Sequence, residues 1–136
     1  MKKALSIKRF YESFMYAVKG LIATYQKEPN MKIHILVSVL VIVFGFLLKV
    51  SLIEWIFLIF SIGLVIASEI INTSIENLVD LATMEYHEKA KIAKDTAAGY
   101  VLVLSVTAAI IGLIIFIPKI ISLIGGLNVW KFKTSN

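Results

Sequence analysis

Residues 69–80 read Glu-Ile-Ile-Asn-Thr-Ser-Ile-Glu-Asn-Leu-Val-Asp and close a long apolar run that begins near Leu52. On a helix, which turns about 100° per residue, the polar residues of this stretch share one stripe: Glu69, Asn72, Thr73, Glu76 and Asp80. Isoleucine, leucine and valine cover the rest of the helix surface. Acids on such a helix need a counter-charge, which a metal ion, another cation or a neighbouring helix can supply.

The composition around this stretch is that of a membrane protein. The chain has 136 residues, of which 59% are hydrophobic, and its mean hydropathy is +0.88. A soluble domain is usually about 45–50% apolar. The length fits a single domain. The absence of cysteine excludes disulfides and thiolate metal sites.

The hydropathy pattern predicts an all-α integral membrane protein, with an N-terminal amphipathic surface helix followed by three transmembrane helices. Basic and aromatic residues in the first segment are typical of a helix that lies in the membrane interface. One membrane domain is expected over residues 1–136, divided as follows: surface helix about 5–27, spans about 32–49, 52–81 and 95–117, and a flexible tail about 122–136, loosened by Pro118 and Gly125-Gly126.

The distribution of lysine and arginine predicts the orientation. Most of them precede the first span or lie between the second and third, and cationic segments favour the cytoplasmic side. The N-terminus and second loop are therefore expected in the cytoplasm, although Lys119, Lys131 and Lys133 in the tail oppose this weakly. The N-terminal segment lacks the features of a cleavable signal peptide, so the first span is expected to stay in the mature protein.

Several ionisable groups should meet at the cytoplasmic edge of the bilayer: Glu28, the acidic stripe, Lys94 and Asp95. Carboxylates and phosphates together suit Mg²⁺, and a lysine suits a phosphate, so the residues favour phosphoryl transfer. Ion or proton conduction is equally consistent, because acidic stripes also line conduction pathways. No Walker loop occurs in the sequence. His34, at the start of the first span, is interpreted as an interfacial or packed residue.

The same residues resemble the small prokaryotic diacylglycerol kinase family. The resemblance covers nearly the whole chain and rests on residues 69–80, on Glu85-Tyr86-His87, on Ala93-Lys94-Asp95, and on Lys19-Gly20-Leu21 with Glu28. It implies an integral membrane kinase that uses ATP and Mg²⁺. It also implies a surface helix, three spans, and a homotrimer whose sites are shared between subunits. No nucleic acid partner is expected.

Within the family, the chain is similar to the Gram-positive branch, through Ile53-Glu54-Trp55, residues 93–99 and the apolar run that ends at Pro118. In that branch the acceptor is usually undecaprenol. The resemblance therefore implies ATP-dependent phosphorylation of undecaprenol to undecaprenyl phosphate at the cytoplasmic membrane interface. Diacylglycerol is the alternative acceptor, with phosphatidic acid as its product. A non-enzymatic cation-conducting membrane subunit is the alternative from another class.

The resemblance also assigns roles to matching positions. Glu69 is expected to be the catalytic base for the lipid hydroxyl, with Asn72 orienting it or supporting the γ-phosphate. Glu28 and Glu76 are the expected Mg²⁺ ligands, which bring in the ATP phosphates. Asp80 is expected to brace the end of its helix. The remaining contacts to ATP are expected from Arg9, Tyr16, Glu85, His87, Lys94 and Asp95.

Overall fold

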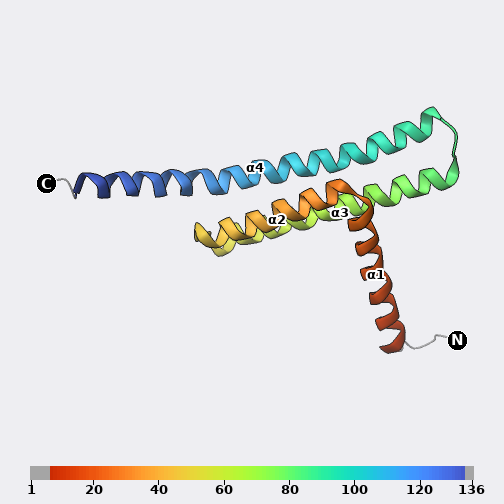
Figure 1. Cartoon of the computed structure of the whole chain (residues 1–136), viewed down its shortest axis with the longest axis horizontal. Coiled ribbons are helices and arrows are strands. Elements are labelled where there is room, and N and C mark those ends of the chain that lie inside the picture. The colour runs from red at the N-terminus through yellow and green to blue at the C-terminus, as the bar shows by residue number, and fades with distance from the viewer. Residues whose placement is uncertain (1–6, 134–136) are drawn as a thin grey trace.

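The computed structural model of the protein describes residues 7–133, which form helices and no strand (Figure 1). The helices are α1 (Ile7–Lys27), α2 (Pro29–Leu47), α3 (Leu52–Ala82) and α4 (Glu88–Lys133). Three of them, α2, α3 and α4 as far as Gly125, are long and apolar enough to cross a membrane. This confirms the all-α membrane architecture predicted from the sequence.

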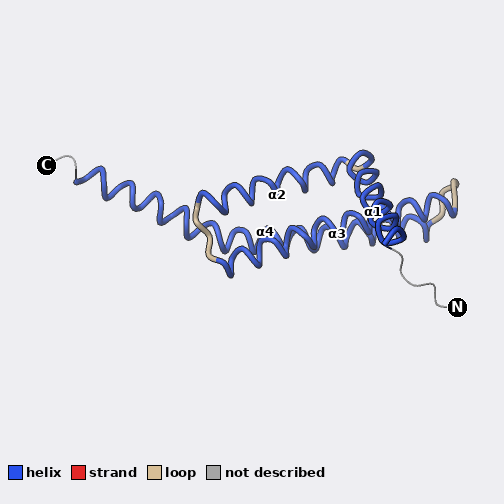
Figure 2. Tube along the Cα trace, turned by 90° about the horizontal axis from the view of Figure 1, so that it is seen from below, coloured by secondary structure: helices blue, strands red, loops and turns tan. Residues whose placement is uncertain are grey.

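Helix α3 is the centre of the arrangement because it contacts α1, α2 and α4. The last three helices run side by side, while α1 leaves them at a steep angle (Figure 1). Figure 2 shows α4 following α3 closely, with α2 lying apart from both over much of its length. Most inter-helix contacts accordingly join α3 to α4. The first part of the acidic stripe, Glu69, Asn72 and Thr73, therefore lies buried inside the helix bundle, while Asp80 at its end is exposed.

The turns between the helices follow from local sequence. Glu28 is extended, with φ −99° and ψ 115°, and Pro29 occupies the first turn of α2, where its missing N–H is no loss. Lys49, with φ 50°, makes the tight turn after α2. A capping box then starts α3: the Glu54 N–H donates to Ser51 Oγ, and Glu54 Oε2 accepts from the Ser51 N–H at 2.6 Å.

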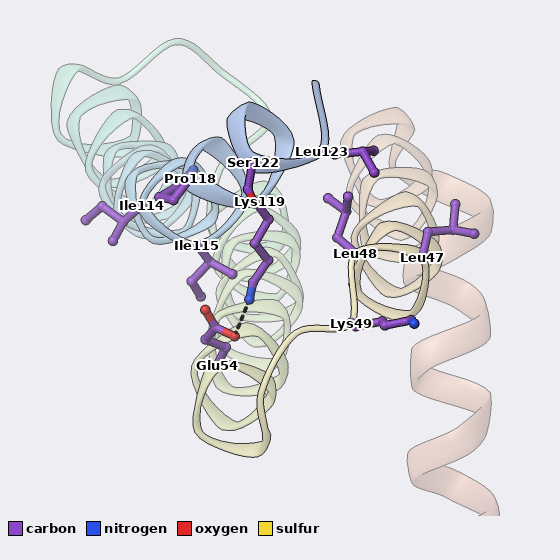
Figure 3. Close-up of a pocket in the computed structure, with 10 residues that line it drawn as sticks. All are labelled: Leu47, Leu48, Lys49, Glu54, Ile114, Ile115, Pro118, Lys119, Ser122 and Leu123. Carbon is purple, nitrogen blue, oxygen red and sulfur yellow. Dashed lines mark ion pairs between the residues drawn. The ribbon is translucent and has the colours of Figure 1, made fainter. Parts of the chain in front are cut away.

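Glu54 has a second partner at this end of the bundle. Lys119 reaches from α4 toward α3 and its Nζ lies 2.9 Å from Glu54 Oε2 (Figure 3). A cavity of about 710 Å³ beside this ion pair separates the end of α2 from α4. Glu54 is about 22 Å from Glu69 along the helix axis, at 1.5 Å per residue. Glu54 therefore has a structural role, in capping α3 and pairing with Lys119, and does not belong to the acidic stripe.

Two helix boundaries differ from those predicted. Helix α4 starts at Glu88 rather than near residue 95, and it continues through Pro118 to Lys133, whereas the sequence predicted a span ending near 117 and a flexible tail from about 122. A proline removes one backbone hydrogen bond and crowds the preceding turn, but long apolar residues on both sides continue the helix. Residues 5–6 of the expected surface helix and 134–136 of the tail lie outside the described residues.

Gly45 is required where α2 packs on α3. A Cβ atom at this position would lie 2.6 Å from Cη2 of Trp55. We expect Gly45→Ala to lower the free energy of unfolding by about 1–3 kcal/mol, since the indole ring cannot shift without disturbing its neighbours. Thermal unfolding of the purified protein in detergent measures this change. Gly63→Ala is the control, because a Cβ atom there meets nothing within 4 Å; equal melting of both variants would contradict the close packing.

Candidate active site

Glu69 is buried in the middle of α3 without a partner. Glu69 is 1% exposed, and neither of its carboxylate oxygens makes a hydrogen bond. Isolated ionisable groups are rarely buried, because losing their hydration is costly unless something else binds them. The fold therefore leaves the Glu69 carboxyl group without a partner from the chain, so that a bound ligand or ion would have to supply one.

Glu69 is one of the residues that line a cavity of about 320 Å³ between α2, α3 and α4. Its lining residues are Asn30, Ile33, His34, Glu69, Asn72, Ala98, Val101, Leu102 and Ser105. In the part of the chain whose side chains are described, four buried side-chain polar atoms lack a hydrogen-bond partner: both Glu69 oxygens, Asn72 Oδ1 and Ser105 Oγ. All four belong to residues of this one cavity, which therefore has the character of a binding site.

An apolar cavity of about 520 Å³ adjoins this polar one. The two share Ile33, His34 and Ser105 as lining residues. Helix α3 contributes Leu58 and Val65 to the apolar cavity, and α4 contributes small residues from Ser105 to Gly112. A polar cavity that contains a carboxyl group and continues into an apolar one within membrane-spanning helices suits an amphiphile with a polar head and a hydrocarbon chain.

The two predicted metal ligands lie close to Glu69. Glu28 and Glu76 are the charged groups near enough to act on the Glu69 carboxyl electrostatically. Asn72 Nδ2 donates to Glu76 Oε1 at 3.0 Å, which fixes the carboxylate of Glu76 one turn from Asn72. Glu28 follows Lys27, whose Nζ donates to Asn77 Oδ1 at 2.6 Å. This hydrogen bond ties the elbow between α1 and α2 to α3 and so places Glu28 beside the acidic stripe.

A second polar pocket, of about 340 Å³, lies at the hairpin between α3 and α4. It collects four of the residues expected to contact ATP: Glu85, His87, Lys94 and Asp95. Lys94 Nζ donates to Asp80, and Lys91 Nζ donates to Asp95 Oδ2 at 2.6 Å. His87 Nδ1 accepts from the Lys89 N–H at 3.2 Å, at the start of α4.

The structure does not bring Arg9 and Tyr16 to this pocket, since neither is among its lining residues. They lie on α1, whose N-terminal half extends away from the bundle (Figure 1). Tyr16 instead makes a cation–π interaction with Lys19 of the same helix, whose Nζ lies 5.7 Å from the ring centroid. Their roles in nucleotide binding stay predictions.

Sequence reasoning missed three features of the site. The sequence predicted that the acidic stripe and Lys94 meet at one edge of the bilayer, but it did not identify Asp80 as the residue that pairs with Lys94. His34 was interpreted as an interfacial residue, yet it lines both cavities. Ser105 carried no signal at all, because a serine in an apolar helix usually bonds its own backbone.

Comparison with known proteins decides the family. Residues 15–116 match the family model described as prokaryotic diacylglycerol kinase. The chain belongs to this family. It is 43% identical over 114 residues to a protein named undecaprenol kinase from Bacillus subtilis, covering 84% of this chain and 93% of that protein. These findings confirm the predicted family and the predicted class of enzyme, which is a lipid kinase. Membership of this class implies ATP as the phosphoryl donor.

Other similar proteins are named diacylglycerol kinase. The protein from Synechocystis is 39% identical over 112 residues, which are 82% of this chain and 64% of that protein. The protein from Escherichia coli K12 is 34% identical over 102 residues, which are 75% of this chain and 84% of that protein. Kinases named for two different lipids are therefore related to the chain, and membership of the family does not itself select between them.

Lys94 should need Asp80 to bind nucleotide well. Asp80→Asn removes the charge that holds the Lys94 ammonium in the hairpin pocket, so we expect the KM for ATP to rise about three- to tenfold. The KM for the lipid and the melting temperature should change little, because the ion pair is exposed. Steady-state kinetics with Glu88→Gln as the control tests this. A normal KM for ATP in Asp80→Asn would contradict a role for the pair.

Proposed function

We propose that the chain transfers the γ-phosphate of ATP to undecaprenol, making undecaprenyl phosphate at the cytoplasmic face of the cell membrane. The observation that carries this proposal is the burial of both Glu69 oxygens, unpaired, where the polar cavity adjoins the apolar one. Undecaprenol is favoured over diacylglycerol because the similarity to the Bacillus subtilis undecaprenol kinase extends over most of both chains. Diacylglycerol is the second candidate acceptor.

The reaction that this site suits is an in-line displacement at phosphorus. The acceptor hydroxyl donates its proton to a Glu69 oxygen as its own oxygen bonds to the γ-phosphorus. The bond from that phosphorus to the β–γ bridging oxygen breaks, and the electron pair leaves with ADP. General base catalysis of this kind and alignment of the reactants are the main contributions that a protein makes to phosphoryl transfer. The burial of Glu69 beside the apolar cavity supports its role as the base for a lipid hydroxyl.

The residues around Glu69 fit a magnesium ion. Mg²⁺ is commonly held by one or two carboxylates together with the phosphates of its substrate, and Glu28 and Glu76 would be those ligands. In residues 7–125 no group of three or more potential ligands gathers as a dedicated metal site, which agrees with an ion that arrives with ATP. When bound, the ion would offset the charge of the phosphates. Lys94 would contact them from the hairpin pocket.

Membrane orientation and assembly are part of the same proposal. The lysine-rich N-terminal segment and the residues around Lys89, Lys91 and Lys94 support a cytoplasmic location for the α1–α2 elbow and the hairpin. ATP would then reach Glu28 and Lys94 from water, while the lipid reaches Glu69 from the bilayer. A homotrimer with shared sites is proposed from the family resemblance. Apolar side chains exposed along α2 and α4 are available for contacts with lipid or other copies.

Glu69→Gln tests the base. The amide keeps the size of the carboxyl group and breaks no hydrogen bond in the chain, but it cannot accept the proton. We expect turnover to fall by about 10²–10⁴, with melting temperature and oligomer size unchanged. Transfer of labelled phosphate from ATP to undecaprenol in micelles measures this. Glu54→Gln is the control, because Glu54 pairs with Lys119 far from the site. Wild-type turnover in Glu69→Gln would show that another group is the base.

The identity of the acceptor can be tested together with the apolar cavity. Wild-type protein should show a higher kcat/KM with undecaprenol than with diacylglycerol under matched conditions. Gly112 lines the apolar cavity, and a Cβ atom there meets nothing within 4 Å. We expect Gly112→Leu to lower kcat/KM for undecaprenol about tenfold or more by occupying the space of its chain, and to leave short prenols nearly unaffected.

Gly63→Leu is the matched control, because Gly63 also has open space around it but lines neither cavity. A higher kcat/KM for diacylglycerol than for undecaprenol would overturn the acceptor assignment and leave the lipid kinase intact. Equal losses on long and short prenols, with dissociation of the oligomer, would show that a neighbouring copy fills the apolar cavity.

A further inference from the structure

Ser105 has the one buried hydroxyl group in the described part of the membrane-spanning helices that makes no hydrogen bond, whereas Ser122, which also makes none, is exposed. A serine or threonine in such a helix usually donates to a carbonyl in the preceding turn. Most of those in α2, α3 and α4 do so: Ser38, Ser61, Ser68, Thr73, Ser74, Thr96 and Thr107. Ser105 Oγ is buried and makes no hydrogen bond. The fold thus leaves free a donor that the helix backbone could satisfy.

Ser105 also occupies a special place. It lines both the polar cavity that contains Glu69 and the apolar cavity next to it. Glu69 is on α3 and Ser105 on α4, so the two side chains reach the polar cavity from different helices. Both oxygens of Glu69 can only accept hydrogen bonds when ionised, whereas the serine hydroxyl can donate one. A ligand located between them would need a donor and an acceptor.

An alcohol supplies that combination in a single atom. Its oxygen has one proton to donate and two lone pairs, so it can donate to Glu69, accept from Ser105 and keep a lone pair for attack on phosphorus. A prenol has no other polar atom with which to fix its head. We propose that Ser105 Oγ binds the hydroxyl oxygen of the acceptor lipid and positions it over Glu69, with the hydrocarbon chain in the apolar cavity. This inference rests on the proposed function.

Ser105→Ala should therefore impair lipid binding selectively. We expect the KM for undecaprenol to rise about five- to tenfold, which corresponds to one neutral hydrogen bond. The value of kcat and the KM for ATP should stay within about twofold, since other residues bind ATP and accept the proton. Thr107→Ala is the matched control on the same helix, because Thr107 is exposed and donates to Val103 O.

Two inhibitors can distinguish a hydrogen bond between Ser105 and the lipid from an effect of Ser105 on the shape of the cavity. The methyl ether of a prenol can accept from Ser105 but cannot donate to Glu69, whereas the hydrocarbon without oxygen can do neither. Ser105→Ala should weaken inhibition by the ether about five- to tenfold and leave inhibition by the hydrocarbon unchanged. Equal weakening of both inhibitors would show that Ser105 only shapes the cavity.

The two proposals fail in distinguishable ways. Absence of undecaprenol phosphorylation by the wild-type protein would overturn the proposed function. Normal wild-type turnover with an unchanged KM for undecaprenol in Ser105→Ala would overturn this inference alone.

Discussion

The burial of one carboxyl group inside a bundle of apolar helices governs this structure. An unpaired Glu69 destabilises the fold, because nothing in the chain replaces its hydration. The packing of the other helices around α3 compensates for this destabilisation. Helix α3 contacts all the other helices and is held in place by them, and the Glu76 carboxylate two turns away is fixed by a hydrogen bond from Asn72. The carboxyl group of Glu69 therefore destabilises the fold and is also the group to which the catalytic role is proposed.

The attachment of the helices to one another is uneven. Helix α4 is joined to α3 by ion pairs near both ends of the shared length, Lys119 with Glu54 and Lys94 with Asp80. Helix α2 has no comparable ion pair to α4 among the described residues; its closest packing on α3 is at Gly45 and Trp55, where the chain turns. The space between α2 and α4 is consequently the side of the bundle on which a lipid can enter most easily.

Features that depend on spacing along one helix could be predicted from the sequence. The stripe from Glu69 to Asp80 needs only the helical period, and the hydropathy pattern is enough to predict the three membrane-spanning helices. Features that depend on contacts between helices could not. The pairing of Lys94 with Asp80, and the position of Ser105 and Glu69 around one cavity, arise from how α3 and α4 pack. Helix α4 continues beyond the predicted span because the apolar residues on both sides of Pro118 extend it past the break that a proline favours.

The closeness of Glu28, Glu69 and Glu76 also bears on what happens after phosphoryl transfer. A phosphate monoester carries a charge of about −1.5 to −2 near neutral pH. In the proposed reaction Glu69 would hold the proton taken from the alcohol, and the negative charges of Glu28 and Glu76 would disfavour the new phosphate in the site. The alcohol enters uncharged and meets no such barrier. Under the proposed function, the acidic cluster would therefore favour release of the charged product over its retention, without opposing entry of the neutral alcohol.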